Sequence, residues 1–321
     1  MAFPHSVITD VVASTIENRS KTVADNIVAQ NALLSEINKA GNVRTISGGN
    51  EIYETFTFAE NGNAGSYSGY DTLPTGAQDV ISGANFVLSQ YACPVTFSGL
   101  EQLQNSGKEQ IFDLIKTRVK VAETSLMNLM NRHLYLDGTG NNGKNLLGLA
   151  AAVPLTSTNV YGGIDRNTAI GAFWKNQTLT AGATGTSSTI QGFLNTLMLS
   201  CTFGSEKPKF IIASPVVYTL LNASLVAIQR VASSDSANAG FTTISYQGIP
   251  VYYESVASGI TDKYAYFINP NYLHFRPHAA RNFVPLDDKS SVNQDATVKT
   301  LAWAGQVTCS GSRYQGIYFN N

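Results

Sequence analysis

The sequence predicts an α+β fold, and three observations support this. Two runs of strand-like alternation, residues 50–60 and 81–96, precede a long amphipathic helix at residues 107–133, and residues 272–319 alternate strongly again. No internal repeat is present, and helices and strands occupy partly separate stretches of the chain. With 321 residues and 43% hydrophobic content, the protein can bury a sizeable core as one large or two modest domains.

The chain begins with a predicted helical arm and continues into a long hairpin. Ser6 can cap the helix, whose apolar residues recur at mostly helical spacing until Gly41 ends it. The hairpin tip, residues 61–76, has too much glycine to form a core element. If each hairpin strand has about twelve residues, the hairpin projects roughly 40 Å.

This hairpin carries charge of one sign. The acids between residues 45 and 107 are Glu51, Glu54, Glu60, Asp71, Asp79 and Glu101, and the same stretch contains no lysine or arginine. The helix that follows is basic in part, with Lys108, Lys116, Arg118 and Lys120. A loop this long within a compact domain is usually functional. The pattern therefore predicts an exposed arm that reaches a neighbouring copy of the same protein.

Beyond the long helix, a glycine-rich turn at residues 136–148 leads into a mixed α/β region over residues 150–269. The expected elements are helices over residues 191–199 and 215–230, strands over 209–213 and 248–254, and a polar loop over 233–240. Pro215 is well suited to the first turn of its helix. Residues 272–319 should return as long strands.

Composition indicates a subunit of an assembly. Charged residues make up 13% of the chain, against roughly 25% in ordinary soluble domains. The chain has 15 Tyr and 15 Phe, and interface cores are likewise poor in charge and rich in aromatic residues. We therefore expect a protein that covers much of its surface with copies of itself.

Composition also argues against several other classes. A net charge of -1 without a basic cluster argues against strong electrostatic binding of nucleic acid. Three widely spaced cysteines, Cys93, Cys201 and Cys309, suggest neither a disulfide framework nor a zinc site. The sequence shows no secretory signal and no apolar run long enough for a membrane span, so folding in a cytosol is expected.

The strongest enzyme-like signal is the turn from Gly138 to Lys144, which nearly matches a phosphate-binding loop. The position that should carry a hydroxyl is Asn145, and a helix rather than a strand precedes the turn. A calcium loop starting at Asp137 fails at the sixth and twelfth positions. His274 and His278 flank Pro277 in a strand-like region, which favours a structural role. We predict no catalytic residue, no cofactor and no metal, with a nucleotide-binding enzyme kept as a remote alternative.

The order of these elements resembles the major capsid proteins of tailed bacteriophages, which have the Hong Kong 97-like fold. The resemblance rests on the arm, the hairpin, the long helix and the segments LDGTGNNGKNLLGL, KFIIASPVVYTLL, GIPVYYES and VKTLAWAGQVTCSGSRYQGIYF. It implies an N-terminal arm (1–44), an E-loop hairpin with base strands (45–97), a P domain with a spine helix (98–149), an A domain (150–270), and return strands of the P domain with the end of the A domain (271–321).

The resemblance also gives the charge pattern a role. In such shells the E-loop lies over the P domain of an adjacent subunit, so Glu54, Glu60 and Asp71 would meet bases there. The candidate bases are Lys116, Arg118, Lys120 and Arg132. Some relatives cross-link through an E-loop lysine, but this hairpin has none, so the shell would be held by non-covalent contacts.

The function implied is a structural, non-enzymatic protein that self-assembles through pentamers and hexamers into an icosahedral shell around double-stranded DNA. Expected partners are further copies, a separate scaffolding protein that guides the procapsid, a portal and a decoration protein, with no membrane and no sequence-specific DNA binding. The protein would be found in the virion capsid after assembly in the cytoplasm of a bacterial host. An encapsulin-like compartment around an enzyme cargo is the nearest alternative.

Overall fold

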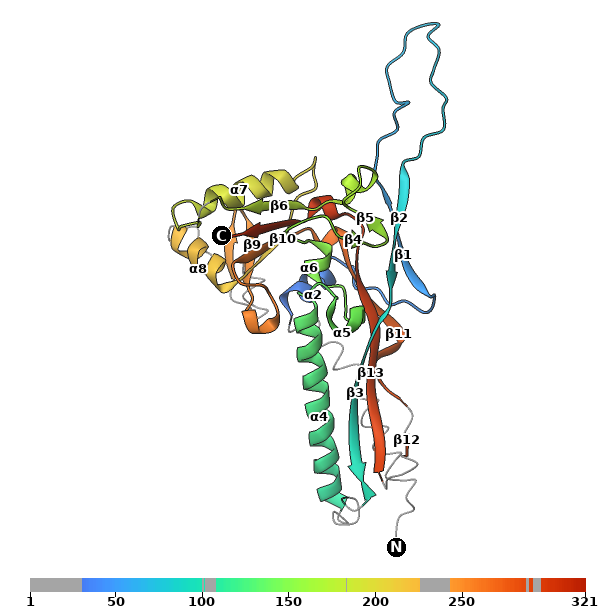
Figure 1. The fold of residues 1–321 in the computed structure, drawn as a ribbon, viewed down its shortest axis with the longest axis vertical. Helices are drawn as coiled ribbons and strands as arrows, with labels where there is room; N and C mark the ends of the chain where they lie inside the picture. The colour runs from blue at the N-terminus through green and yellow to red at the C-terminus, as the bar shows by residue number, and fades with distance from the viewer. Residues whose placement is uncertain are drawn as a thin grey trace.

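The computed structural model describes residues 31–99, 101, 108–182, 184–225, 243–286, 289–290 and 296–321. The protein has three parts, a leg, a lobe and a projecting hairpin (Figure 1). The hairpin and the leg extend in opposite directions, and the lobe lies to one side between them. Most of the predicted N-terminal arm and the polar loop at residues 233–240 lie outside the described residues.

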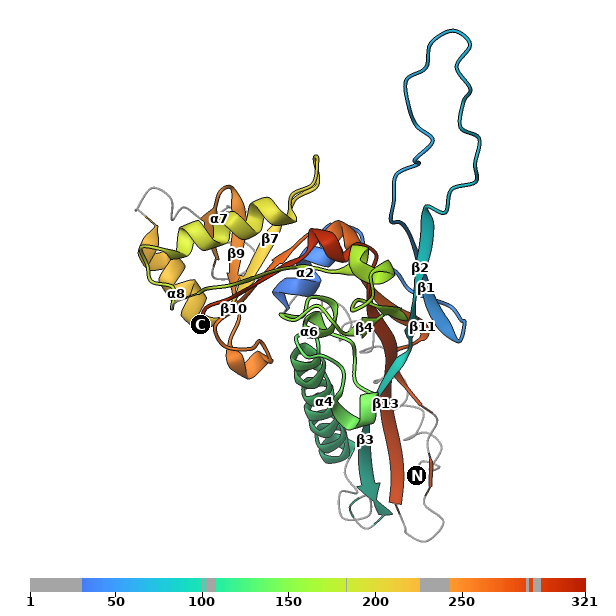
Figure 2. The ribbon, with the colours of Figure 1, turned by 45° about the horizontal axis from the view of Figure 1, so that its top comes forward.

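The hairpin consists of β1 (Glu51–Thr57) and β2 (Ile81–Val87), joined by residues 58–80. The strands pair antiparallel from Glu51 opposite Val87 to Thr57 opposite Ile81. We call the paired strands the root and residues 58–80 the tip. The tip stands clear of the lobe in both ribbon views (Figures 1 and 2), which agrees with the predicted projecting hairpin.

The predicted strand run at residues 81–96 forms two strands in different sheets. After β2, the chain passes Leu88 and enters β3 (Ser89–Ser98), which pairs with β13 (Ala296–Cys309) rather than with β1. The buried positions change parity at this point, from Ala84 and Phe86 to Tyr91, Val95 and Phe97. Because side chains alternate between the two faces of a strand, this shift redirects the buried face toward a different partner.

The leg is a long helix on a sheet. The helix α4 (Lys108–His133) confirms the prediction over residues 107–133. Its buried residues recur at helical spacing, and Ala122 packs against Val95 and Phe97 of β3. The sheet of the leg contains β3, β11 (Leu273–Pro285), β12 (Lys289–Ser290) and β13 (Ala296–Cys309), with β13 at its centre.

The lobe is a six-stranded sheet with two helices on one face. Its strands, in spatial order, are β6 (Gln177–Thr180), β14 (Gly316–Phe319), β10 (Tyr264–Ile268), β7 (Phe210–Ala213), β9 (Ile249–Tyr253) and β8 (Thr243–Tyr246). The helices α7 (Ile190–Cys201) and α8 (Pro215–Ser224) cover one face. The strands predicted over residues 209–213 and 248–254 and the helix predicted over 191–199 are confirmed as β7, β9 and α7. The helix predicted over residues 215–230 is confirmed over its first ten residues, and most of the remainder lies outside the described residues.

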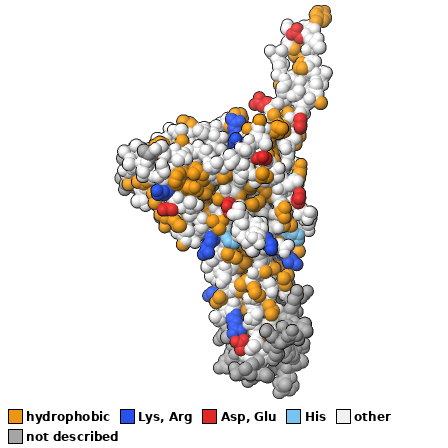
Figure 3. Space-filling model, viewed as in Figure 1, with side chains coloured by type: hydrophobic (Ala, Val, Ile, Leu, Met, Phe, Trp, Pro, Cys, Tyr) orange, Lys and Arg blue, Asp and Glu red, His pale blue; other side chains and the backbone are white. Residues whose placement is uncertain are grey.

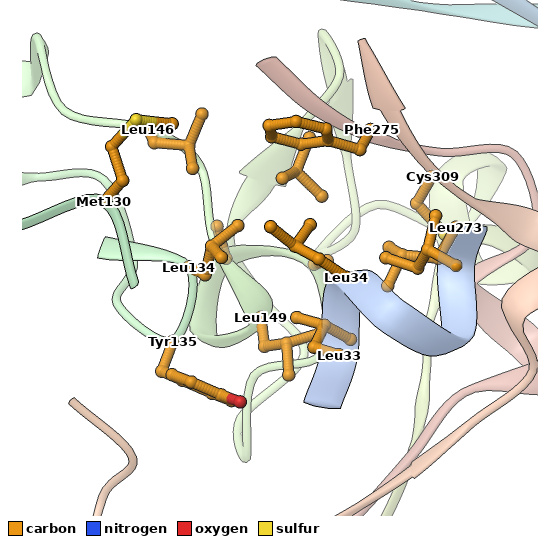
Figure 4. Close-up of a cluster of buried hydrophobic side chains, with 14 of the residues drawn as sticks. Leu33, Leu34, Met130, Leu134, Tyr135, Leu146, Leu149, Leu273, Phe275 and Cys309 are labelled. Carbon is orange, nitrogen blue, oxygen red and sulfur yellow. The ribbon is translucent and has the colours of Figure 1, made fainter. Parts of the chain in front are cut away.

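A shared core joins leg and lobe. The short helix α2 (Ala32–Lys39) begins at Asn31, whose side chain accepts a hydrogen bond from the Leu34 amide at 3.2 Å. Its Leu33 and Leu34 lie among apolar side chains from the end of α4 and from β11 (Figure 4). Downstream of α2, residues 42–46 bond to one edge of β11 through parallel bridges at Val43 and Ile46.

Short elements connect these parts. They are α5 (Gly140–Gly143), α6 (Leu149–Ala152), β4 (Val160–Tyr161), β5 (Ile164–Asp165) and the 3-10 turns η1 (Ile170–Trp174), η3 (Val256–Ser258), η4 (Pro270–Tyr272) and η5 (Ser312–Tyr314). Within the described residues, no helix combines the length and the apolar character needed to cross a bilayer.

Candidate subunit-contact surfaces

The root of the hairpin is anchored to the body by aromatic side chains. Phe56 of β1 stacks on Trp174 with ring centroids 4.4 Å apart, and Phe86 of β2 meets the edge of Tyr161 at 5.1 Å. The Asn85 amide also donates to the Gly162 carbonyl at 2.9 Å. Gly162 has a φ of +60, and a Cβ there would come within 2.6 Å of the Ala84 methyl, so only glycine allows this close approach.

Glu54 fixes the root to the sheet of the leg. Its carboxylate accepts hydrogen bonds from Arg276 Nε at 2.8 Å, Arg276 Nη2 at 3.1 Å and Thr308 Oγ1 at 2.8 Å. The side chains of Glu54 and Arg276 are only 10% and 14% exposed, so this is a charge-assisted pair within the subunit. Sequence reasoning placed Glu54 at a contact between copies, whereas the structure gives it partners in its own chain.

The tip has few contacts with the rest of the subunit. Its internal hydrogen bonds are local, such as Asn63 Nδ2 to the Gly76 carbonyl at 2.6 Å and the Ser68 amide to Asp71 Oδ2 at 2.8 Å. Glu60 and Asp71 are exposed. Figure 3 shows acidic and apolar side chains along the hairpin and no basic ones. The tip therefore offers an acidic, partly apolar surface away from the subunit core.

Exposed apolar side chains continue along the outer face of the root. Tyr53, Ile81 and Val87 point away from the buried face that holds Glu54, and they are 62%, 65% and 66% exposed. In the tip, Tyr67, Tyr70 and Leu73 are also exposed. An arm that exposes this much apolar surface is suited to contact with another protein.

The candidate bases on α4 differ in their availability. Lys120 and Arg132 are exposed, and Val121 and Leu129 beside them expose apolar surface. Arg118 instead donates to Glu101 at 2.6 and 2.9 Å and to the Thr96 carbonyl at 2.9 Å.

The bonds from Arg118 have an electrostatic consequence for Glu101. They lower the pKa of Glu101 to about 2, with a smaller contribution from the Ser98 amide. The side chain of Lys116 lies outside the described part of the chain. Of the predicted bases, Lys120 and Arg132 therefore remain as exposed contact candidates.

Two polar side chains near the root are the buried Arg166 and the half-buried His274, and only His274 was singled out from the sequence. Arg166 is fully buried, donates to the carbonyls of Ala151 and Ala152 at 3.4 and 2.8 Å, and lies 4.9 Å above the Tyr161 ring. Burial lowers the pKa of Arg166 and raises that of Tyr161. These positions come together only through tertiary contacts, so spacing in the sequence could not reveal them.

His274 is the second group, on β11 beside the Glu54 pair. Its Nε2 bonds to Ser310 Oγ at 3.0 Å, and its buried Nδ1 has no hydrogen-bond partner. Burial lowers the pKa of His274 to about 4; Glu54 opposes this, and the positive charges of Arg276 and Arg44 add to it. The histidine is therefore neutral at physiological pH.

The turn that resembles a phosphate-binding loop has a different geometry. It follows α4 and contains the left-handed residues Asn141 and Asn142 in α5, so the strand, loop and helix order of a phosphate-binding loop is not formed. The described residues contain no group of three or more His, Cys, Asp or Glu side chains placed to hold a metal ion.

Comparisons with known proteins identify the fold. No family model matches the chain, and no curated protein matches it. Among solved structures, it is similar to a chain of the cyanophage A-1(L) capsid asymmetric unit, with a TM-score of 0.65, 16% identity, and coverage of 88% of this chain and 91% of that chain.

Two further capsids show the same likeness. A chain of the native GTA particle capsid gives a TM-score of 0.55 at 11% identity, covering 88% of this chain and 89% of that one. The capsid of Myoviridae phage XM1 gives 0.51 at 13% identity, covering 88% and 90%. The chain thus has the mixed helix-and-sheet fold of phage capsid proteins, as the resemblance in the sequence predicted.

Proposed function

We propose that this chain is the major capsid protein of a tailed bacteriophage, a structural protein without catalytic activity. The observation that carries the proposal is the structural match of 88% of the chain to a phage capsid protein. In this assignment the hairpin is the E-loop, α4 is the spine helix of the P domain, and the lobe is most of the A domain. The domain boundaries remain those predicted from the sequence.

The hairpin supports self-assembly through a contact that uses different surfaces on the two partners. Its tip points away from its own leg and lobe (Figures 1 and 2). When each subunit places its arm on the next, such contacts close into rings, here pentamers and hexamers of an icosahedral shell around double-stranded DNA. Because the hairpin contains no lysine, the shell is held without an E-loop cross-link.

The structure narrows the residues proposed for this contact. Glu60 and Asp71 of the tip are the acids, and Lys120 and Arg132 on α4 of the neighbour are the bases. Glu54 and Arg118 are left out because each has a partner in its own chain. Exposed ion pairs contribute only about 0–1 kcal/mol each. They therefore determine how the arm aligns on the neighbouring subunit, while the apolar contacts, repeated over many copies, stabilise the shell.

The proposed partners and location follow from the shell. The partners are a separate scaffolding protein, a portal and a decoration protein. The protein assembles in the cytoplasm of the bacterial host and is finally located in the virion. The packaged DNA is enclosed without sequence-specific contacts. Non-specific enclosure is consistent with the net charge of -1.

A charge-swap experiment tests the contact. The double variant Glu60→Lys/Asp71→Lys and the double variant Lys120→Glu/Arg132→Glu should each reduce the yield and salt tolerance of shells, followed by light scattering and electron microscopy. Combining all four substitutions should recover part of the yield, because the charges are again opposite. Asp262→Lys, at an exposed acid of the lobe, serves as the control and should assemble normally.

The outcomes separate the contact from the function. Normal shells from both double variants would show that these four residues do not form the contact, while leaving the capsid function intact. A wild-type chain that stays monomeric with every neighbouring gene product of its genome would contradict the capsid function itself.

A further inference from the structure

The hairpin tip contains a site suited to spontaneous chemical modification. In an Asn-Gly pair, the backbone nitrogen of glycine can attack the side-chain amide carbon of asparagine, because glycine has no Cβ to hinder ring closure. The chain has two such pairs, Asn61-Gly62 and Asn142-Gly143. We propose that Asn61 deamidates in the folded protein, whereas Asn142 is protected by the turn that contains it.

The geometry at Asn61 favours the reaction. Asn61 and Gly62 are exposed to water, and the Asn63 amide donates to Asn61 Oδ1 at 2.9 Å. This hydrogen bond folds the Asn61 side chain back toward the Asn61-Gly62 peptide bond. It also polarises the side-chain carbonyl of Asn61, whose carbon is the atom attacked. Among the described residues, the Gly62 amide has no hydrogen-bond acceptor that would hold it away from this carbon.

The geometry at Asn142 opposes the same reaction. The Gly143 amide, which would have to attack, donates instead to the Thr139 carbonyl at 3.1 Å. Asn142 also has the left-handed backbone angles φ 55 and ψ 41 inside α5. The nucleophile is therefore engaged, and the backbone of Asn142 is held in a tight turn.

The reaction needs only water. The Gly62 nitrogen loses its proton to solvent base and bonds to Asn61 Cγ, the Cγ–Nδ2 bond breaks, and ammonia leaves with a proton from solvent. Water then adds to either carbonyl of the cyclic imide, and opening of the ring gives aspartate or isoaspartate at position 61. No oxidation or reduction occurs.

Conversion would add a carboxylate next to Glu60 in a hairpin that has no base. Isoaspartate would also add a methylene group to the backbone of the tip. If the tip contacts a basic surface of another copy, the age of a subunit before assembly would change that contact. This consequence rests on the proposed function, whereas the reaction itself requires no assembly.

The test compares two sites in one chain. The unassembled protein is incubated in mildly alkaline buffer, either folded or unfolded in urea, and peptides containing positions 61 and 142 are quantified by mass spectrometry with enzymatic methylation of isoaspartate. In urea the two sites should convert at similar rates. In the folded protein, position 61 should keep converting while position 142 slows several-fold or more.

A variant at the neighbouring glycine sharpens the test. A Cβ at Gly62 would have the end of the Gln78 side chain, 3.4 Å away, as its nearest neighbour, so Gly62→Ala can be tolerated. This variant should slow conversion at position 61 several-fold and leave position 142 unchanged. The inference is wrong if folded position 61 stays unmodified while it converts in urea, or if folded position 142 converts as fast as position 61.

Discussion

Within one hairpin, the root buries Phe86 and Glu54 against the body and packs the half-buried Phe56 there, whereas the tip exposes Tyr70 and Asp71 to solvent. Both regions are rich in polar residues and poor in bases, but the long-range contacts are concentrated in the root, and the tip adds a contact between Phe58 and Phe173 at its base. The root therefore contributes to the stability of the subunit, and the tip contributes little. A segment that the subunit does not need for its own stability is available for contacts between subunits.

The largest expected difference between root and tip concerns Trp174. Trp174→Ala should lower the free energy of unfolding of the unassembled subunit by about 3–5 kcal/mol, because it opens a cavity under Phe56. The variant also loses the bond from Trp174 Nε1 to the Tyr161 carbonyl at 3.0 Å. Chemical denaturation measures the change. Tyr70→Ala in the tip is the control and should stay within about 0.5 kcal/mol of wild type; equal losses in both variants would show that the tip is part of the stable fold.

The next effect concerns the buried charge pair. Glu54→Gln should destabilise the subunit by about 2–4 kcal/mol, because Arg276 would remain buried without its negative partner. Glu51→Gln changes an exposed acid on the same strand and should have almost no effect. Replacing both Glu54 and Arg276 by glutamine should cost less than the two single changes added together. Strict additivity in this double-mutant cycle would show that the pair does not couple root and leg.

A smaller effect concerns His274, beside the same pair. Its pKa falls from 6.5 to about 4 on folding, so below pH 6.5 the unfolded chain binds a proton that the folded chain does not. Stability should therefore decline as the pH falls from 6.5 to 4, by on the order of 2–3 kcal/mol, and this contribution should level off below pH 4.

Replacing the histidine isolates its share of the acid sensitivity. His274→Gln should flatten the decline between pH 6.5 and 4 in denaturation curves. His278→Gln, on the same strand, should keep the slope of the wild type. An unchanged slope in the His274 variant would assign the acid sensitivity to other groups.

Patterns between neighbouring residues predicted many of the helices and strands, whereas the pairing of strands far apart in the sequence could not be predicted from them. The alternation of β1, the spacing of α4 and the apolar run of β7 depend on neighbours in sequence, so each was predicted close to its observed bounds. The division between β2 and β3 was missed, although apolar residues change parity between Phe86 and Tyr91. That parity change was the one available signal for two sheets.

The candidate contact residues show the same limit. The absence of bases in the hairpin is a local property, and the exposure of Glu60 and Asp71 agrees with it. The partner of Glu54 lies 222 residues away in the sequence, and that of Arg118 lies 17 residues away. A single sequence does not reveal which acid meets which base, so internal pairs could not be separated from exposed charges.

The order in which the chain is synthesised adds a consequence of the Glu54 anchor. A ribosome completes the hairpin long before Arg276 and Thr308 emerge, since Thr308 lies 254 residues beyond Glu54. The central strand of the leg, β13, and the lobe strand β14 also come late in the chain. The carboxylate anchor can form only after nearly the whole chain has been made, whereas the aromatic partners of the root, Tyr161 and Trp174, are available much earlier. The arm is therefore fixed in two steps, and its charged anchor forms late in folding.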